Sequence, residues 1–230
     1  MSKHVGEVKF LDDIKDKDLF QAKEFLTELS TALPKKCEKY FNATKEQVYI
    51  YSEIQLHTIL APIIDDISDA YLLECPTDRI KPGDSKSNSG WIDYWVLYKK
   101  NVFLMELKYS YSNIEDYTTD KKILKEWSKA NEQLEDIPKV ADFSVNEEPV
   151  IKIALQFNLT YDDSKLNEVY SLDNCIKIGK GIKTYLNNEG DAPNFIFNWS
   201  VDESMIKHTY EDGSEQNYPY IHLLARVYKD

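Results

Sequence analysis

Two apolar runs in the middle of the chain carry its clearest pattern of hydrophobic and polar positions. The runs, at 91–98 and 102–109, are rich in aromatic and β-branched residues, and two lysines stand between them. This pattern predicts a β-hairpin with a two-residue turn. In that register, Asp93 and Glu106 face each other across the two strands.

A lysine joins this acid pair. Side chains alternate between the two faces of a sheet, so Lys108 projects from the same face as Glu106 and lies diagonally from Asp93. Like charges placed opposite each other destabilise a hairpin by up to about 1 kcal/mol unless a cation neutralises them. A divalent metal ion is one such cation. A turn moved by one residue keeps the three groups on one face, whereas a three-residue loop would separate them.

The setting of these charges distinguishes them from a chance pattern. An acid followed by Glu-x-Lys at this spacing arises often in a chain with 30% charged residues. Here both strands carry apolar residues on both faces, which is typical of inner strands in a sheet that is covered on both sides. Charged side chains on such strands need a partner or a function.

Helical periodicity precedes the hairpin. Apolar residues recur at helical spacing from 12 to 33, and Pro34 is expected to end this segment. A second helix begins near Ser52, where Gln55 completes a capping box, and it carries Glu53 on its apolar stripe. The position of this carboxylate is equally compatible with a first-turn acid that the helix dipole favours.

A turn-rich loop, 74–90, precedes the hairpin, and a long helix, 118–140, follows it. Gln133 adjoins the apolar stripe of this helix. A charge run on a helix is usually a solvated face, but this one follows the acid hairpin directly and could hold phosphates. It consists of Lys121, Lys122, Lys125 and Lys129.

The remaining pattern predicts an α/β fold with a central mixed β-sheet flanked by helices. A strand at 150–160 completes a strand-helix-strand crossover after the hairpin. Residues 1–48 are expected to form an N-terminal helical extension packed on the core, and residues 49–230 a single globular α/β domain. Further elements are expected at 166–186, 194–200 and 220–228.

Composition limits the possible functions. The 230 residues carry a formal net charge of −12, which argues against a protein that coats nucleic acid generally. The charge is uneven, because residues 81–130 hold nine lysines against seven acids. Three cysteines at wide, irregular spacing predict reduced thiols and a cytoplasmic location. No apolar run approaches the length of a membrane span, so no membrane association is expected.

The order of these residues resembles that of the PD-(D/E)XK nuclease superfamily, which has the restriction-endonuclease-like fold. The resemblance covers roughly residues 50–160, and Ile92 stands where the family's name has proline, a common departure. The short motif assigns no subfamily. Its matching positions are Glu53 on a helix, Asp93 on a strand, Glu106-Leu107-Lys108 on the next strand, and Gln133 on the following helix.

The resemblance implies a metal-dependent nuclease that hydrolyses phosphodiester bonds of DNA or RNA. Its ligands for Mg²⁺ or Mn²⁺ would be the carboxylates of Asp93 and Glu106 and the carbonyl of Leu107, a set of oxygens that suits a hard cation. Glu53 would bind the same or a second ion. Lys108 would orient or activate the attacking water, and Gln133 would steady the site or the scissile strand.

Nucleic acid is therefore the expected partner. The acidic charge predicts weak affinity for duplexes, because duplex binding depends on neutralising phosphates. Sixteen tyrosines, among them Tyr109 and Tyr111, could stack on unpaired bases or could pack in the core and its rim. A single-stranded or structured substrate, or a protein partner that brings the DNA, fits the acidic chain better than tight duplex binding.

Two other hypotheses remain open. In one, a nuclease-like fold without catalysis serves as a binding or regulatory protein in a larger assembly, and its acidic surface docks on a basic protein partner. In the other, the acid hairpin of an α/β domain is fortuitous. The last hypothesis requires that Asp93 and Glu106 point to opposite sides of the sheet.

Overall fold

The computed structural model describes residues 5–81, 83, 86–118, 120–163 and 170–229. Its helices are α1 (Phe20–Thr44), α2 (Glu53–Ile67), α3 (Lys121–Glu135), α4 (Leu172–Asn188) and the short α5 (Glu203–Ile206). Its strands are β1 (Gly6–Asp12), β2 (Ala70–Arg79), β3 (Asn88–Tyr98), β4 (Asn101–Asn113), β5 (Val150–Asp162), β6 (Phe195–Val201), β7 (Lys207–Thr209) and β8 (Glu215–Tyr228). Single 3-10 turns lie at Lys17–Leu19, Val48–Ile50 and Val140–Phe143.

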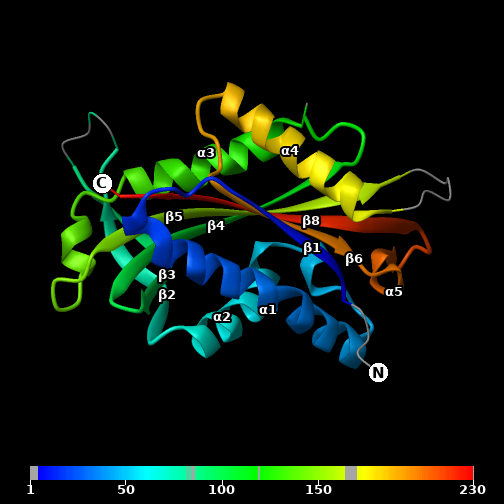
Figure 1. Ribbon diagram of the computed structural model, residues 1–230, viewed down its shortest axis with the longest axis horizontal. Coiled ribbons are helices and arrows are strands. Elements are labelled where there is room, and N and C mark those ends of the chain that lie inside the picture. Colours follow the sequence, from blue (N-terminus) through cyan, green and yellow to red (C-terminus); the bar gives the residue numbers. More distant parts are fainter. Residues whose placement is uncertain (1–4, 82, 84–85, 119, 164–169, 230) are drawn as a thin grey trace.

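The described strands form one eight-stranded mixed sheet in the order β1-β6-β8-β5-β4-β3-β2, and β7 pairs with β8. Helices α3 and α4 cover one face of this sheet, while α1 and α2 cover the other (Figure 1). The expected α/β class with a central mixed sheet flanked by helices is therefore confirmed. β4 and β5 run parallel, as the predicted crossover through α3 requires, and the other neighbouring strands are antiparallel.

The central hairpin has the predicted register. Tyr98 pairs with Asn101, so Lys99 and Lys100 are the two turn residues. Their φ angles are 45° and 64°, which is the left-handed conformation that a two-residue hairpin turn needs at both positions. Lysine adopts this conformation less readily than glycine or asparagine, so the apolar strands rather than the turn residues specify the hairpin.

The predicted limits of the first helix were wrong. α1 begins at Phe20 and continues through Pro34 to Thr44, although a proline inside a helix removes one backbone hydrogen bond and costs about 3 kcal/mol. The apolar stripe continues past the proline as far as buried Cys37, so packing offsets this cost. The N-terminal segment also contributes a strand, since β1 pairs with β6 in the main sheet instead of forming only a helical extension.

The segment expected as a loop at 74–90 contains much of β2. This strand pairs with β3 along the edge of the sheet, and only Cys75 among its residues is buried. Leu72 and Leu73 are both exposed, so β2 lacks the alternation of apolar and polar residues that identifies a half-buried strand. Its pairing with β3 is therefore not visible in the local sequence pattern.

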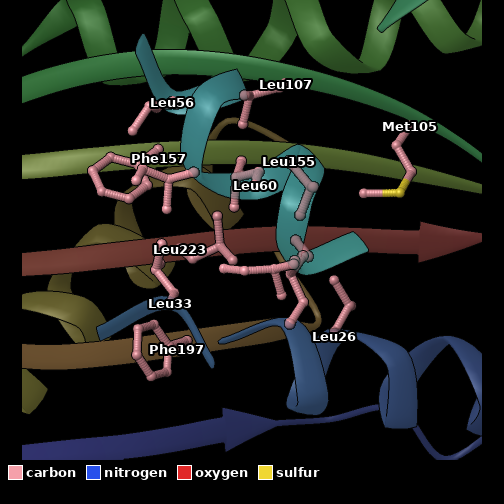
Figure 2. Close-up of a cluster of buried hydrophobic side chains, with 14 of the residues drawn as sticks. Leu26, Leu33, Leu56, Leu60, Met105, Leu107, Leu155, Phe157, Phe197 and Leu223 are labelled. Atoms are coloured by element: carbon pink, nitrogen blue, oxygen red, sulfur yellow. The ribbon is translucent and has the colours of Figure 1, made fainter. Parts of the chain in front are cut away.

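The larger core lies between the sheet and the pair α1 and α2. Figure 2 shows leucines of both helices meeting side chains of the central strands in one apolar cluster. This packing fixes α2 against β4 and β5, and so determines where the first residue of α2, Glu53, is placed. The labelled residues are Leu26, Leu33, Leu56, Leu60, Met105, Leu107, Leu155, Phe157, Phe197 and Leu223.

The helices that the structure describes include none with both the length and the apolar character to cross a membrane.

Candidate active site

β3 and β4 separate where the predicted acids lie. The last pair of their ladder joins Tyr94 to Met105, one position short of the expected pairing of Asp93 with Glu106. Beyond it, the backbone N–H of Leu107 donates a hydrogen bond to Asp93 Oδ2 at 2.7 Å. The carboxylate of Asp93 thus takes the place of a backbone acceptor, which holds it in the opening between the two strands.

Lys108 lies at the centre of this opening. Its Nζ is 3.5 Å from Asp93 Oδ2, 3.6 Å from Glu106 Oε2 and 3.7 Å from Glu53 Oε1. It also donates a hydrogen bond of 2.7 Å to the carbonyl of Leu107. Side chains from α2, β3 and β4 therefore converge on one buried ammonium group. We call Glu53, Asp93, Glu106 and Lys108 the carboxylate–lysine cluster.

Glu53 forms the outer side of the cluster. It is the first residue of α2, and its side chain is about one third exposed. Partial burial raises its pKa, while Lys108 opposes this effect and Asp93 adds to it. The predicted helix start at Ser52 is confirmed, but the capping box does not form, because the Ser52 hydroxyl donates to the Gln55 side chain instead of accepting from the backbone.

Glu106 is the most buried acid of the cluster. Burial raises its pKa to about 7, the charge of Asp93 adds to this effect, and Arg79 and Lys108 oppose it. Its Oε1 accepts a hydrogen bond from the Arg79 guanidinium. Its Oε2 is buried and has no hydrogen-bond partner among the described residues, although it faces Lys108. Glu106 therefore presents to the cluster one oxygen that faces Lys108 without accepting a hydrogen bond.

Arg79 belongs to the site although the sequence pattern did not identify it. Its guanidinium donates to the Glu106 carboxylate and to the carbonyls of Trp91 and Gln133. Gly90 leaves room for this side chain, since a Cβ at Gly90 would lie 2.6 Å from Arg79 Nε. Arg79 is the last residue of β2, so a prediction of that strand would have placed it beside β3.

The structure brings Gln133 to the site through its backbone. The carbonyl of Gln133 accepts from Arg79, while its side-chain Oε1 is buried without a hydrogen-bond partner in the described part of the chain. Gln133 therefore helps to hold Arg79 through its backbone carbonyl, which any residue at this helix position would supply. The expected role of its side chain stays a prediction.

The cluster contains oxygen atoms of the kind that hard divalent cations prefer. Among the described residues, no group of three or more His, Cys, Asp or Glu side chains converges tightly enough to hold a metal ion by itself. Lys108 Nζ lies instead in the space that the three carboxylates share. When ionised, these carboxylates exceed the charges of Arg79 and Lys108 by one. The free Oε2 of Glu106 and the Leu107 carbonyl complete a set of oxygen donors that suits Mg²⁺ or Mn²⁺.

Comparisons with protein-family models, with curated proteins and with solved structures find no match for this chain. A proposal for its function therefore depends on the geometry and chemistry of the cluster.

Proposed function

We propose that this protein is a metal-dependent nuclease that hydrolyses phosphodiester bonds, with the carboxylate–lysine cluster as its active site. One observation carries the proposal: Lys108 Nζ lies 3.5 to 3.7 Å from carboxylates of three different elements, where two inner strands separate. A fold alone requires no such concentration of buried charge, which costs several kcal/mol of desolvation per ion. The order of these residues resembles that of a restriction-endonuclease-like core, which supports the proposal.

The metal ligands would be oxygens of four residues. Asp93, Glu106 and the carbonyl of Leu107 would hold Mg²⁺ or Mn²⁺, and Glu53 would bind directly or through water. A divalent ion held there polarises the phosphate and increases the acidity of water. Glu106 would bind the ion through Oε2, because Arg79 binds its Oε1, whereas Oε2 accepts no hydrogen bond from the described residues.

Lys108 would act on the substrate with its ammonium group. The group is buried, so its attraction to an anionic phosphate is stronger than it would be in water. Bound phosphate would accept hydrogen bonds from Nζ, and the same group would orient the attacking water and stabilise the charge that develops on the phosphate. In the absence of substrate, the three surrounding carboxylates lie 3.5 to 3.7 Å from Nζ.

We further infer that the protein acts in a reducing compartment such as the cytoplasm. Cys37, Cys75 and Cys175 are all free and buried. Burial raises the pKa of each thiol, which keeps them protonated and poorly reactive. Their burial supports a structural role for them, separate from the proposed chemistry.

Hydrolysis tests the proposal directly. The purified full chain should cut DNA or RNA strands in Mg²⁺ or Mn²⁺ and should be inactive in EDTA. Lys108→Ala should abolish cutting, whereas Lys100→Ala, at the exposed turn of the same hairpin, should cut like the wild type. If cutting survives in Lys108→Ala, the activity belongs to another site or to a contaminant, and the proposal is wrong.

One observation favours the alternative of a catalytically idle nuclease fold that serves as a binding or regulatory protein. Arg79 and Lys108 already neutralise two of the three carboxylates without any metal ion. In such a protein the cluster would serve to hold β2, β3, β4 and α2 together. It would bind neither Mg²⁺ nor Mn²⁺, and charge-conserving changes such as Lys108→Arg would leave its binding function intact.

A further inference from the structure

β4 continues past the carboxylate–lysine cluster without pairing to β3. β3 leaves β4 after Met105, whereas β5 pairs with β4 as far as Asn113. No strand among the described residues pairs with the other edge of β4 over 106–113. Tyr109 and Tyr111 lie on this segment, one and three residues after Lys108. The chain therefore presents aromatic side chains close in sequence to the site, on a part of β4 that pairs only with β5 among the described strands.

These tyrosines belong to a larger group. The ring centroids of Tyr109 and Tyr111 are 6.5 Å apart, and those of Tyr111 and Tyr161 are 6.1 Å apart. The Tyr109 hydroxyl donates to the carbonyl of Tyr49, which ties β4 to the segment before α2. In that neighbourhood His208 contacts two further rings. We call Tyr51, Tyr109, Tyr111, Tyr161 and Tyr210 the tyrosine surface.

His208 joins the two rings that lie outside β4 and β5. Its ring centroid lies 4.6 Å from that of Tyr210 and 6.1 Å from that of Tyr51. Tyr51 in turn precedes Glu53 by only two residues. Members of the tyrosine surface therefore lie close in sequence to two members of the cluster, to Lys108 on β4 and to Glu53 at the start of α2.

Three of these rings are too exposed to serve only the core. Tyr51, Tyr111 and Tyr210 are 52%, 43% and 38% exposed, whereas tyrosines that fill the core, such as Tyr94 and Tyr98, are at most 1% exposed. Large aromatic side chains that gather on one surface and stay exposed indicate a binding site. An exposed aromatic ring can stack on another flat group.

The two ends of the tyrosine surface differ in charge. Lys122 Nζ lies 4.1 Å from the ring centroid of Tyr111 and donates to its hydroxyl at 2.8 Å. Lys121 and Lys125 are exposed on the same helix. At the other end, the Tyr51 hydroxyl donates to the carboxylate of Glu46, which would repel a phosphate. An anionic chain on the tyrosine surface would therefore run its phosphates on the side of α3.

We propose that the tyrosine surface binds single-stranded nucleic acid and leads the strand to Lys108. Stacking needs unpaired bases, because a duplex hides the faces of its bases, and it tolerates any sequence. The net charge of −12 likewise disfavours the close approach of a duplex, with its doubled density of phosphates. The choice of nucleic acid as the ligand rests on the proposed nuclease function, but binding and hydrolysis are measured separately.

Binding of an oligo(dT) strand in EDTA tests the inference, since no hydrolysis occurs without metal. Fluorescence anisotropy should show that Tyr111→Ala and Tyr51→Ala each weaken binding about tenfold, as expected for the loss of one stacked base. Tyr111→Phe keeps the ring and should bind like the wild type. The matched control is Phe20→Ala, because Phe20 is 48% exposed but lies on α1, away from the tyrosine surface. An oligo(U) strand should give the same pattern, and a duplex should bind more weakly.

The outcomes separate this inference from the proposed function. Unchanged binding in both alanine variants, or tighter binding of the duplex, would overturn the inference, and metal-dependent cutting of duplexes would then leave the nuclease proposal standing. If the wild type binds no nucleic acid, the inference is wrong. Binding that depends on the rings, without any hydrolysis when metal is added, would support nucleic-acid binding by the tyrosine surface and contradict the proposed nuclease function.

Discussion

Replacing Glu106 by glutamine should make the metal-free protein more stable at pH 8. The carboxylate is buried, and burial with the charge of Asp93 raises its pKa from the usual 4.5 to about 7. Folding therefore holds an ionised group in a place that disfavours its charge. Glutamine has nearly the same shape, carries no charge, and can still accept a hydrogen bond from Arg79 with its Oε1.

The magnitude follows from the two pKa values. Each pKa unit corresponds to about 1.4 kcal/mol, so a pKa raised from 4.5 to about 7 costs about 3 kcal/mol above pH 7. The amide of glutamine would face Lys108 less favourably than a carboxylate does, which reduces the gain. We expect Glu106→Gln to raise the free energy of unfolding by about 1 to 3 kcal/mol at pH 8, or about 2 to 4 °C in Tm per kcal/mol.

The stability difference between Glu106→Gln and the wild type should depend on pH. Below pH 4.5 the wild-type carboxyl is protonated in both the folded and the unfolded protein, so the variant should have no advantage. Between pH 4.5 and 7 the unfolded protein ionises first, the wild type loses stability, and the advantage of the variant grows. Above pH 7 the difference should be constant.

Urea unfolding in EDTA at pH 4, 6 and 8 measures this difference. Glu132→Gln, an exposed change on α3, is the control and should leave stability unchanged at each pH. A variant that is less stable than the wild type at pH 8, or a difference that does not vary with pH, would refute the electrostatic account of Glu106.

Other substitutions test the supports of the site. Arg79→Gln removes a charge that holds the pKa of Glu106 down, so the pH midpoint of Mn²⁺ binding should move upward. Arg79→Lys should move the midpoint less, and equal midpoints in all three proteins would rule out this role of Arg79. Gly90→Ala places a Cβ 2.6 Å from Arg79 Nε, and the same midpoint should shift in the same direction by a smaller amount. Gly179→Ala places a Cβ 2.0 Å from Oδ1 of buried Asn198, which is held by a hydrogen bond to His222. Calorimetry should show that the free energy of unfolding falls by about 1 to 3 kcal/mol, and an unchanged Tm would show that α4 can shift.

The hairpin could be predicted because its determinants are local. The apolar runs of β3 and β4 specify each other across a two-residue turn, and this register places Asp93 near Glu106 and Lys108 without help from distant residues. The parallel pairing of β5 with β4 follows from the length of the helix between them. These features are settled by residues that are close in sequence.

The residues that the sequence pattern missed depend on distant contacts. Arg79 reaches Glu106 only because β2 pairs with β3 at the sheet edge, where exposed leucines obscure the strand pattern. Pro34 stays inside α1 because the core on both sides of it continues the buried stripe. The proximity of Glu53 to Lys108 likewise depends on how α2 packs, and the sequence alone indicated it only through the resemblance to the nuclease family.

Titration of the metal-free wild type with Mn²⁺ at pH 8, followed by calorimetry, tests the central claim that the carboxylate–lysine cluster is a metal site. We expect one saturable binding event in the wild type and in Glu132→Gln. Asp93→Asn, which can still accept the hydrogen bond from Leu107, should weaken it at least tenfold, because it removes a charged ligand. Equal binding by wild type and Asp93→Asn, or no binding by either, would contradict the account.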